Sequence, residues 1–366
     1  MSGRLRAIIV KELLAAVRDP AARLILIVPP LMQLFLFGFA ATLEVRNVEI
    51  GVLDRDGGAY SQELIQRIAG SPNVAGIVRL ASERELADAI DGRRVIAALA
   101  FGPDFSADVA AHRPAIVQAV YDGRRSNAAQ ILSSYIERIA GEYGAELRPR
   151  RATGGQTIVR HWFNPNLSFL WFNMPALIVV IGAVSSMAVV AQSVAREREL
   201  GTFDQLMVSP LRLHEILIGK MLAPLIVGFA NATIYAALIP TVFGVPLTGS
   251  IALFYFALTF YLLALVGVGM LVSTLSYTQQ QAFLGSFLVS VPAIMLSGFS
   301  APVDNMPGWL QTIALANPPT HFLPILEGIF LKAMPPGEVL RRTWPMIIIA
   351  TLSLGGAAYL FRLRME

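Results

Sequence analysis

Four long stretches of the chain contain no charged residue, and they set its class. Asp, Glu, Lys and Arg are all absent from residues 24–43, 161–195, 221–303 and 343–361. A helix needs about 20 apolar residues to cross a hydrocarbon core of roughly 30 Å. Three of the stretches each have room for one span, and 221–303 has room for three that are separated by tight turns. The pattern predicts a mainly α-helical membrane protein with six transmembrane helices.

The polar residues 44–160 predict a small α/β domain inserted between the first two transmembrane helices. Apolar, β-branched runs typical of strands occur at 48–54, 74–80, 95–101 and 115–121. Two intervening segments show helical spacing, and Ser82 with Glu85 forms a capping-box pattern at the start of the second. Residues 126–147 predict a longer helix that leads back to the membrane. Alternating strands and helices indicate a sheet with helical crossovers.

Residues 1–23 form a basic, amphipathic lead-in to the first span, which covers 24–43. Apolar residues are interspersed with arginine and lysine in the manner of a helix that lies along the bilayer surface. A straight cytosolic extension of the first span is the alternative, since amphipathicity alone fits both arrangements. No small-residue cleavage signal follows the apolar stretch, so a retained span is favoured over a signal peptide.

Prolines interrupt the apolar residues between 298 and 342, before the last span. One continuous span is excluded by prolines at positions 302, 307, 318, 319 and 324. The segment is nevertheless too apolar for a solvated loop. We expect short re-entrant external helices between the fifth and sixth transmembrane helices, packed on protein or facing a cavity. The region 161–366 then holds transmembrane helices 2–6.

The distribution of Lys and Arg predicts the orientation in the membrane. Basic residues cluster in the lead-in, in the loop after the second span and in the C-terminal tail. Short cytoplasmic segments carry such an excess of basic residues. Six spans then place both termini in the cytoplasm and residues 44–160 outside. Basic and acidic residues balance in that external segment, and the rule concerns short loops rather than whole domains.

The composition excludes several classes of chemistry. There is no cysteine for disulfides or thiolate metal sites, and the four histidines are scattered without metal-ligand spacing. We identify no catalytic residue, no metal site and no P-loop that could bind ATP phosphates directly. The net charge of +4 arises in loops and chain ends. It suits contact with membrane lipids and does not indicate a nucleic-acid partner.

Polar residues inside the apolar regions are candidates for a transport pathway. Asn173 and Asn231 lie within predicted spans, and Glu327 lies in the proline-rich segment near His321. The alternative roles are structural: hydrogen bonds between helices for the asparagines, and a place among the outer headgroups for Glu327. Spans without charge argue against an ion-coupled carrier, which places ionisable groups within its spans.

The densest mixed-charge segment follows the second span and reads "VAREREL GTFDQLMVSP LRLHEILIGK" over residues 194–220. On a helix over 194–207, one apolar face is formed by Leu200, Phe203, Leu206 and Met207. Gly201 allows a bend, and Pro210 ends the pattern. Periodicity alone fits an ordinary interfacial helix and a docking element for a cytosolic partner equally well.

This segment resembles the first cytoplasmic loop of ABC-2 family permeases, the transmembrane subunits of ATP-driven exporters. In that family the pattern E-x-x-x-G-T-x-x-x-L-x-x-[ST]-P-x-x-x-x-x-x-x-x-x-K forms the coupling helix. The resemblance implies a coupling helix at 194–210. The ATPase-docking residues that it implies are Glu197, Glu199, Gly201, Thr202, Phe203, Leu206, Ser209 and Pro210. Lys220 fills the lysine position, whereas Gln205 replaces a glutamate that many members carry.

The resemblance extends over nearly the whole chain. "IGVLDRDGGAYSQELIQRIAG" is similar to the external domain of the drug-efflux branch. "LSGFSAPVDNMPGWLQTIALANPPTHFLPILEGIFLK" is similar to its re-entrant external helices. The implied fold is the six-helix ABC-2, type V exporter-like arrangement with an inserted external α/β domain.

The function implied by this resemblance is that of a permease subunit in the bacterial cytoplasmic (inner) membrane. It would export a hydrophobic or amphipathic substrate as one half of a transporter, beside an identical or homologous second permease half. Cytosolic ABC ATPase subunits would hold ATP and Mg²⁺, and a periplasmic adaptor protein is a further partner that the family allows. The alternative is an ATP-independent membrane receptor or scaffold with an external sensing domain. Such a receptor needs neither a docking helix nor re-entrant helices.

Overall fold

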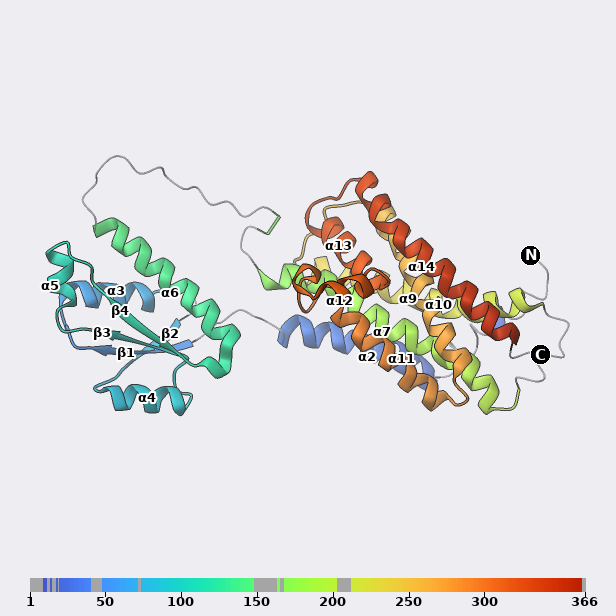
Figure 1. The fold of residues 1–366 in the computed structure, drawn as a ribbon, viewed down its shortest axis with the longest axis horizontal. Coiled ribbons are helices and arrows are strands. Elements are labelled where there is room, and N and C mark those ends of the chain that lie inside the picture. The colour runs from blue at the N-terminus through green and yellow to red at the C-terminus, as the bar shows by residue number, and fades with distance from the viewer. Residues whose placement is uncertain are drawn as a thin grey trace. The chain divides into compact units, whose positions relative to one another are not determined.

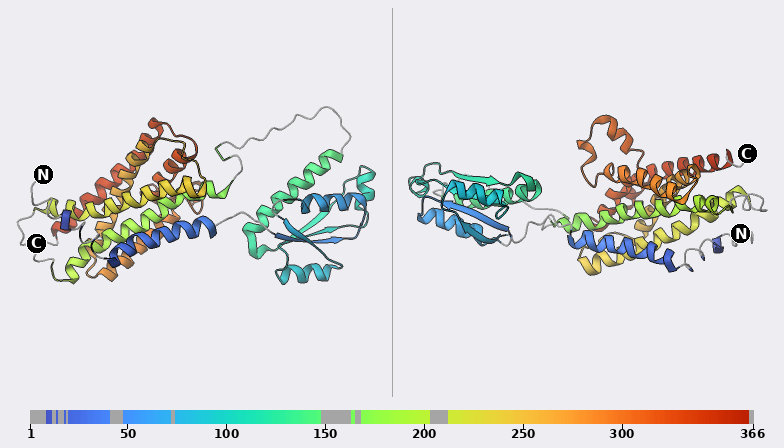
Figure 2. Two further views of the ribbon diagram at one scale, coloured as in Figure 1. Left: turned by 180° about the vertical axis from the view of Figure 1, so that it is seen from behind. Right: turned by 90° about the horizontal axis from the view of Figure 1, so that it is seen from below.

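The computed structural model describes residues 9–11, 14, 18, 20–40, 48–71, 74–147, 163–164, 168–202 and 212–363. The chain divides into two compact units, of which one comprises residues 42–160 and the other comprises 1–41 with 161–366. Figure 1 and Figure 2 show the first unit as a sheet flanked by helices and the second as a bundle of helices. We call them the α/β unit and the helical unit.

Among its described residues, the α/β unit contains a four-stranded mixed sheet with the order β2-β1-β3-β4. Its strands are β1 (Val48–Asp54), β2 (Val74–Arg79), β3 (Ala97–Phe101) and β4 (Val117–Tyr121). β1 is parallel to β2 and β3, whereas β4 runs antiparallel beside β3. Each strand lies within the apolar run that predicted it. Parallel neighbours require crossover connections, and helices supply them here.

The described helices of the α/β unit are α3 (Ala59–Ala69), α4 (Glu83–Asp91), α5 (Phe105–Ala110) and α6 (Ser126–Leu147). Figure 1 shows α4 on one side of the sheet and α3 with α6 on the other. Ile50 and Val52 of β1 belong to the core beneath α3 and α6, whereas Leu53 belongs to the core beneath α4. This alternation follows from the two-residue period of a strand. The unit therefore has a core of its own on each face of the sheet.

Hydrogen bonds at the helix ends agree with the predicted capping pattern. Ser82 Oγ accepts from the N–H of Glu85 at 3.2 Å, and the Glu85 carboxylate accepts from the N–H of Ala81 at 2.8 Å. The predicted pair thus starts α4, with its second bond shifted by one residue. Elsewhere, Arg67 of α3 contacts Glu146 of α6 at 2.8 Å, and its hydrogen bond lowers the pKa of the Glu146 carboxyl.

The described helices of the helical unit are α2 (Pro20–Ala40), α7 (Phe169–Glu199), α9 (Leu213–Phe243), α10 (Ile251–Leu275), α11 (Gln279–Met295), α12 (Gly308–Ala314), α13 (Pro318–Leu331) and α14 (Pro336–Leu363). Within the described ranges, four helices are long and apolar enough to cross a membrane, namely α7, α9, α10 and α14. The chain is therefore a mainly helical, multi-pass membrane protein.

The two other predicted spans correspond to α2 and α11. The described apolar stretch of α2, Ile27–Phe39, is shorter than a bilayer-crossing helix needs. α11 has 17 residues and so rises about 25 Å. α11 starts at Gln279 because Thr278 caps its N-terminus. The Thr278 hydroxyl accepts from Gln281 N–H at 3.2 Å, close behind the end of α10.

α7 is the central helix of the helical unit. Of its most apolar stretch 67% is buried, compared with 28% for α14, and it packs against α2, α9, α10, α11 and α13. Tyr261 of α10 donates from its hydroxyl to the carbonyl of Val179 in α7 at 2.8 Å. Its ring stacks on Phe322 of α13 with the centroids 4.2 Å apart. One buried tyrosine therefore joins three helices, and its polar end has a partner.

The proline-rich segment forms the short helices α12 and α13, and most of α13 is buried. The last carbonyls of α13 accept hydrogen bonds from the connection between α9 and α10. Thr248 N–H donates to Phe330 O at 3.0 Å, and Gly249 N–H donates to Ile329 O at 2.8 Å. These bonds satisfy backbone groups that lipid could not.

The proline-rich segment ends before the predicted bound at residue 342. α14 begins at Pro336, so residues 336–342 belong to the last long helix. Proline is tolerated in the first turn because its missing N–H would have no intrahelical partner there. Pro336 therefore starts a helix instead of breaking one.

Small residues bring α10 and α14 close together. A Cβ atom at Gly267 would lie 2.0 Å from Ser353 Oγ and 2.8 Å from Ser353 Cβ. Residues of this size let transmembrane helices approach closely. At Gly267, a side chain larger than hydrogen requires α14 to move.

Candidate functional site

The sequence motif that begins at Glu197 coincides with the end of α7. Thr202 N–H donates to Glu197 O at 2.9 Å, and Gly201 N–H donates to Arg198 O at 3.0 Å. These two bonds form a Schellman motif, which requires a left-handed residue after the helix. Gly201 supplies it with a φ of 68°, a region that favours glycine.

The described part of the predicted coupling helix at 194–210 ends at Thr202. Residues 194–199 are the last turns of α7, and the helix expected over 194–207 is interrupted after Glu199. The chain bends at Gly201, where a bend was expected. The remaining predicted docking residues lie outside the described residues: Phe203, Leu206, Ser209 and Pro210.

The Glu197 carboxylate is a meeting point for three segments of the chain. Its Oε1 lies 2.8 Å from Lys11 Nζ and 3.3 Å from Lys220 Nζ. Its Oε2 accepts a hydrogen bond from the hydroxyl of Thr202. Lys220 Nζ also donates to the carbonyl of Ser193 at 3.1 Å. We call Glu197, Lys11, Lys220 and Thr202 the Glu197 cluster.

Glu197 and Lys220 are buried, and their charges therefore need these partners. The Lys220 side chain is 0% exposed and the Glu197 side chain 13% exposed. A buried charge is costly unless it is paired and hydrogen-bonded. The pair therefore joins the C-terminal end of α7 to α9, and Lys11 adds the segment that precedes α2.

The next two residues of α7 bind the turn between α10 and α11. Arg198 Nη1 donates to the carbonyls of Thr274 and Ser276, both at 2.8 Å. Glu199 Oε2 accepts from the backbone N–H of Gln279 at 2.8 Å and from its side-chain Nε2 at 3.1 Å. The cation thus lies at the C-terminus of α10 and the anion at the N-terminus of α11. Both placements match the helix dipoles.

The start of α9 is fixed in a similar way. Arg212 N–H donates to the Glu215 carboxylate at 3.0 Å, and Glu215 N–H donates to Arg212 O at 2.9 Å. This reciprocal pair caps the helix. Residues 203–211 are therefore flanked on both sides by hydrogen-bonded helix ends.

Most partners in this site were not predicted. Lys11 and Glu197 are separated by 186 residues, and Glu199 and Gln279 by 80. No helical or strand period relates positions so far apart. The carboxylates of Glu197 and Glu199 bind groups of their own chain, a use that differs from the docking role implied by the motif.

A family model described as "ABC-2 family transporter protein" matches residues 23–359. The chain belongs to the ABC-2 family of transporter proteins. The probable multidrug ABC transporter permease YbhR of Escherichia coli (strain K12) is 44% identical over 362 residues, covering 98% of each chain. The probable multidrug ABC transporter permease YbhS of the same strain is 28% identical over 364 residues, covering 96% of this chain and 95% of that one. The inner membrane transport permease YhhJ is 30% identical over 75% of this chain and 74% of its own length.

The three pathway candidates have different surroundings in this ABC-2 permease. Asn173 is buried in α7, and its Nδ2 lies 3.5 Å from the carbonyl of Phe37 in α2. Asn231 is buried in α9. Glu327 is partly exposed on α13. Asn173 therefore joins two helices, and Glu327 is the most accessible of the three.

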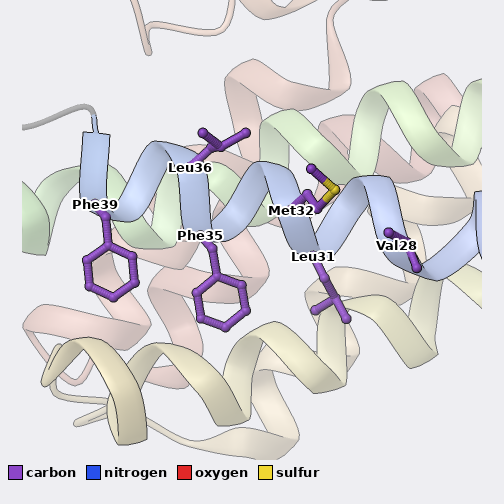
Figure 3. Close-up of a pocket in the computed structure, with 6 residues that line it drawn as sticks. All are labelled: Val28, Leu31, Met32, Phe35, Leu36 and Phe39. Atoms are coloured by element: carbon purple, nitrogen blue, oxygen red, sulfur yellow. The ribbon is translucent and has the colours of Figure 1, made fainter.

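An open apolar groove runs along α2. It is lined by residues of that helix: Val28, Leu31, Met32, Phe35, Leu36 and Phe39. Figure 3 shows the rings of Phe35 and Phe39 projecting from the same side of α2. The Phe39 ring lies 5.0 Å from that of Phe243 in α9, centroid to centroid. These side chains offer no hydrogen-bonding group, so the groove suits lipid chains or the apolar part of a transported molecule.

Proposed function

We propose that this ABC-2 permease is the membrane subunit of an ATP-driven exporter and forms the pathway with a second permease half. Its family and the names of its relatives, two of which are called probable multidrug permeases, support the transport role. The sequence holds no P-loop. Hydrolysis of ATP with Mg²⁺ is then the task of separate cytosolic ATPase subunits.

The observation that carries the proposal is the Glu197 cluster. The segment 203–211 begins after Thr202, whose N–H and hydroxyl bind Glu197. It ends before α9, whose Lys220 reaches the same carboxylate. A segment held at both ends on one buried ion pair transmits a displacement to α7 and α9 instead of absorbing it. An ATPase-docking element needs this property, because its contacts must differ between the two states of the transporter.

The proposed membrane placement has six spans, with α2 and α11 added to the four longer helices. Both termini and the Glu197 cluster lie on the cytoplasmic side of the inner membrane, as the basic residues favour. Trp171 lies in the first turn of α7, and Trp344 lies in the third turn of α14. Both helices start at the outer face in this topology. Tryptophan is enriched at membrane interfaces, and these positions support that boundary.

The proposed cargo is hydrophobic or amphipathic. The apolar groove on α2 supports this class of cargo, because its lining offers only apolar side chains for contact. Glu327 lines the pathway in this proposal, because it is a partly exposed carboxylate and the one acidic residue of α13. The α/β unit lies outside, where it hands on cargo or contacts a periplasmic adaptor.

Copurification tests the proposed function. Tagged permease extracted from its native host in mild detergent should bring down a P-loop ATPase, and the complex should hydrolyse ATP. Leu206→Asp places a charge on the apolar docking face and should remove the ATPase while the permease stays monodisperse. Ile116→Asp, at an exposed position of the α/β unit, is the control and should retain it. Permease that binds no ATPase, or equal binding by Leu206→Asp, would contradict the proposal.

A further inference from the structure

The last turns of α7 are hydrogen-bonded to the end of α10 and to the turn between α10 and α11. Besides the contacts of Arg198 and Glu199, the N–H of Val194 donates to Ser273 Oγ at 3.1 Å. Ser273 is fully buried. Residues 194–199 and 273–279 therefore share hydrogen bonds at the beginning, middle and end of the contact. We call this contact the α7–turn joint.

Small side chains lie beneath the joint. Ala191 and Ala195 of α7 and Ala282 of α11 are fully buried and pack together. Alanine side chains allow two helix backbones to approach closely, so little side-chain material can deform between them. The other side of α11 is largely open, as Leu288 with 77% exposure shows. In the described helical unit, α11 is thus held chiefly through α7 and the turn that precedes it.

The charges of the joint bind mainly backbone groups, whose positions are fixed by the ends of α10 and α11. Arg198 binds carbonyls at the end of α10, and Glu199 binds an amide at the start of α11. A rotation of the α10–α11 turn relative to α7 would break both sets of charge-assisted bonds together. Bonds of this kind are stronger than neutral ones.

From this geometry we infer that Arg198 and Glu199 are positioning residues that make the α10–α11 turn move with the end of α7. The consequence of this inference for transport rests on the proposed function. A displacement that the ATPase imposes after Gly201 reaches α11 through the joint, and reaches α9 through the Glu197 cluster. The motif residue Glu199 then acts inside the permease and is not an ATPase contact.

The first experiment needs no ATPase. Spin labels at Leu200 and Gln280, both exposed, span the joint in permease reconstituted into nanodiscs. Glu199→Ala should broaden their distance distribution, because it removes both bonds to Gln279. Gln279→Ala keeps the backbone bond and should broaden it less. Arg196→Ala, an exposed charge in the same turn, is the matched control and should leave it narrow. An unchanged distribution in Glu199→Ala would overturn the joint.

The second experiment uses the complex purified with its ATPase. A cysteine at Gln280, exposed in the first turn of α11, reports on that helix, and its labelling rate by an impermeant maleimide should change between the nucleotide-free and the ATP–vanadate state. Glu199→Ala should reduce that change by about tenfold while hydrolysis persists. A full change in the variant, or no change in the unmodified chain, would overturn transmission through the joint. Loss of ATPase binding in Glu199→Ala would make the residue a docking contact and overturn the inference.

The two experiments separate the inference from the proposed function. If no ATPase copurifies with the unmodified chain, the proposed function fails. The distance measurement on the permease alone still decides whether Arg198 and Glu199 hold the turn.

Discussion

Glu197 and Lys220 form an ion pair of 3.3 Å across the segment that joins α7 to α9, although 23 residues separate them in the chain. The lysine side chain has no exposed surface, and the carboxylate keeps 13% of its own. Both residues belong to the motif that identifies the loop, yet they face each other and not the solvent. The motif therefore contains the ion pair that holds the two ends of the loop together, in addition to the loop residues themselves.

Loss of one partner of this pair should destabilise the helical unit more than loss of both. Lys220→Met leaves Glu197 with one cation fewer in a mostly buried place, and we expect a cost of about 3 kcal/mol. Glu197→Gln with Lys220→Met leaves no unpaired buried charge and should recover most of that stability. Thermal unfolding of the variants in detergent measures the coupling. Purely additive losses would show that the two side chains act independently.

Gly201 should tolerate asparagine better than valine. Its φ of 68° costs a β-branched residue about 1–2 kcal/mol, whereas asparagine enters the left-handed region more readily. Gly201→Val should therefore lower the unfolding temperature and loosen the end of α7, and Gly201→Asn should stay near the unmodified chain. Hydrogen exchange at Thr202 N–H reports on the same bond. Equal behaviour of the two variants would rule out the left-handed requirement.

Gly267→Ala should disturb the contact between α10 and α14. The added Cβ would lie 2.0 Å from Ser353 Oγ, and such overpacking costs about 1–3 kcal/mol. Combining it with Ser353→Gly should restore stability, because the space is returned from the other helix. Gly355→Ala, where no atom lies within 4 Å of an added Cβ, is the control. Failure of the double variant to recover would assign the loss to another cause.

Cysteine labelling should establish the orientation, since the chain contains no cysteine of its own. Ile116 is 80% exposed in the α/β unit, and Leu200 is 61% exposed at the end of α7. Ile116→Cys should react with an impermeant maleimide added to spheroplasts. Leu200→Cys should react only after the membrane is opened. The reverse pattern would invert the topology and with it the direction of export.

Removal of the α/β unit should leave ATP hydrolysis in place. The unit has its own cores on both faces of its sheet, whereas the Glu197 cluster belongs to the helical unit. Replacing residues 46–158 by a short flexible linker should therefore give a complex that still assembles and hydrolyses ATP at the basal rate. If an assembled complex has lost hydrolysis, the α/β unit takes part in the ATP-driven step.

Local signals in the sequence were sufficient for the positions of many elements. Apolar runs located β1 to β4, the Ser82 and Glu85 pattern located the start of α4, and residues 126–147 coincide with α6. Each of these depends on interactions within a few residues, such as a cap or a side-chain period. The bend at Gly201 was predictable for the same reason, because glycine alone enters the left-handed region without cost.

Long-range pairs limited what could be predicted of the site. Lys220 was a motif position, but its complete burial depends on how α9 packs against α7. The docking role predicted for Glu199 came from the resemblance of the motif, and its contact with Gln279 in another helix could not be read from the sequence. A hydropathy pattern could not predict where α11 begins. The cap at Thr278 sets its start, and the end of the apolar residues does not.

The contact between Gly267 and Ser353 also restricts how the transporter can change shape. Two helices with only the small side chain of Ser353 between them at this point cannot slide or roll past each other without first separating, because packed interfaces shift between discrete arrangements. α10 and α14 should therefore move together as one pair. Between α2 and α9, by contrast, aromatic rings form the contact, as between Phe39 and Phe243. In the proposed exporter, an alternating-access movement would accordingly displace α2 and α9 relative to the paired α10 and α14.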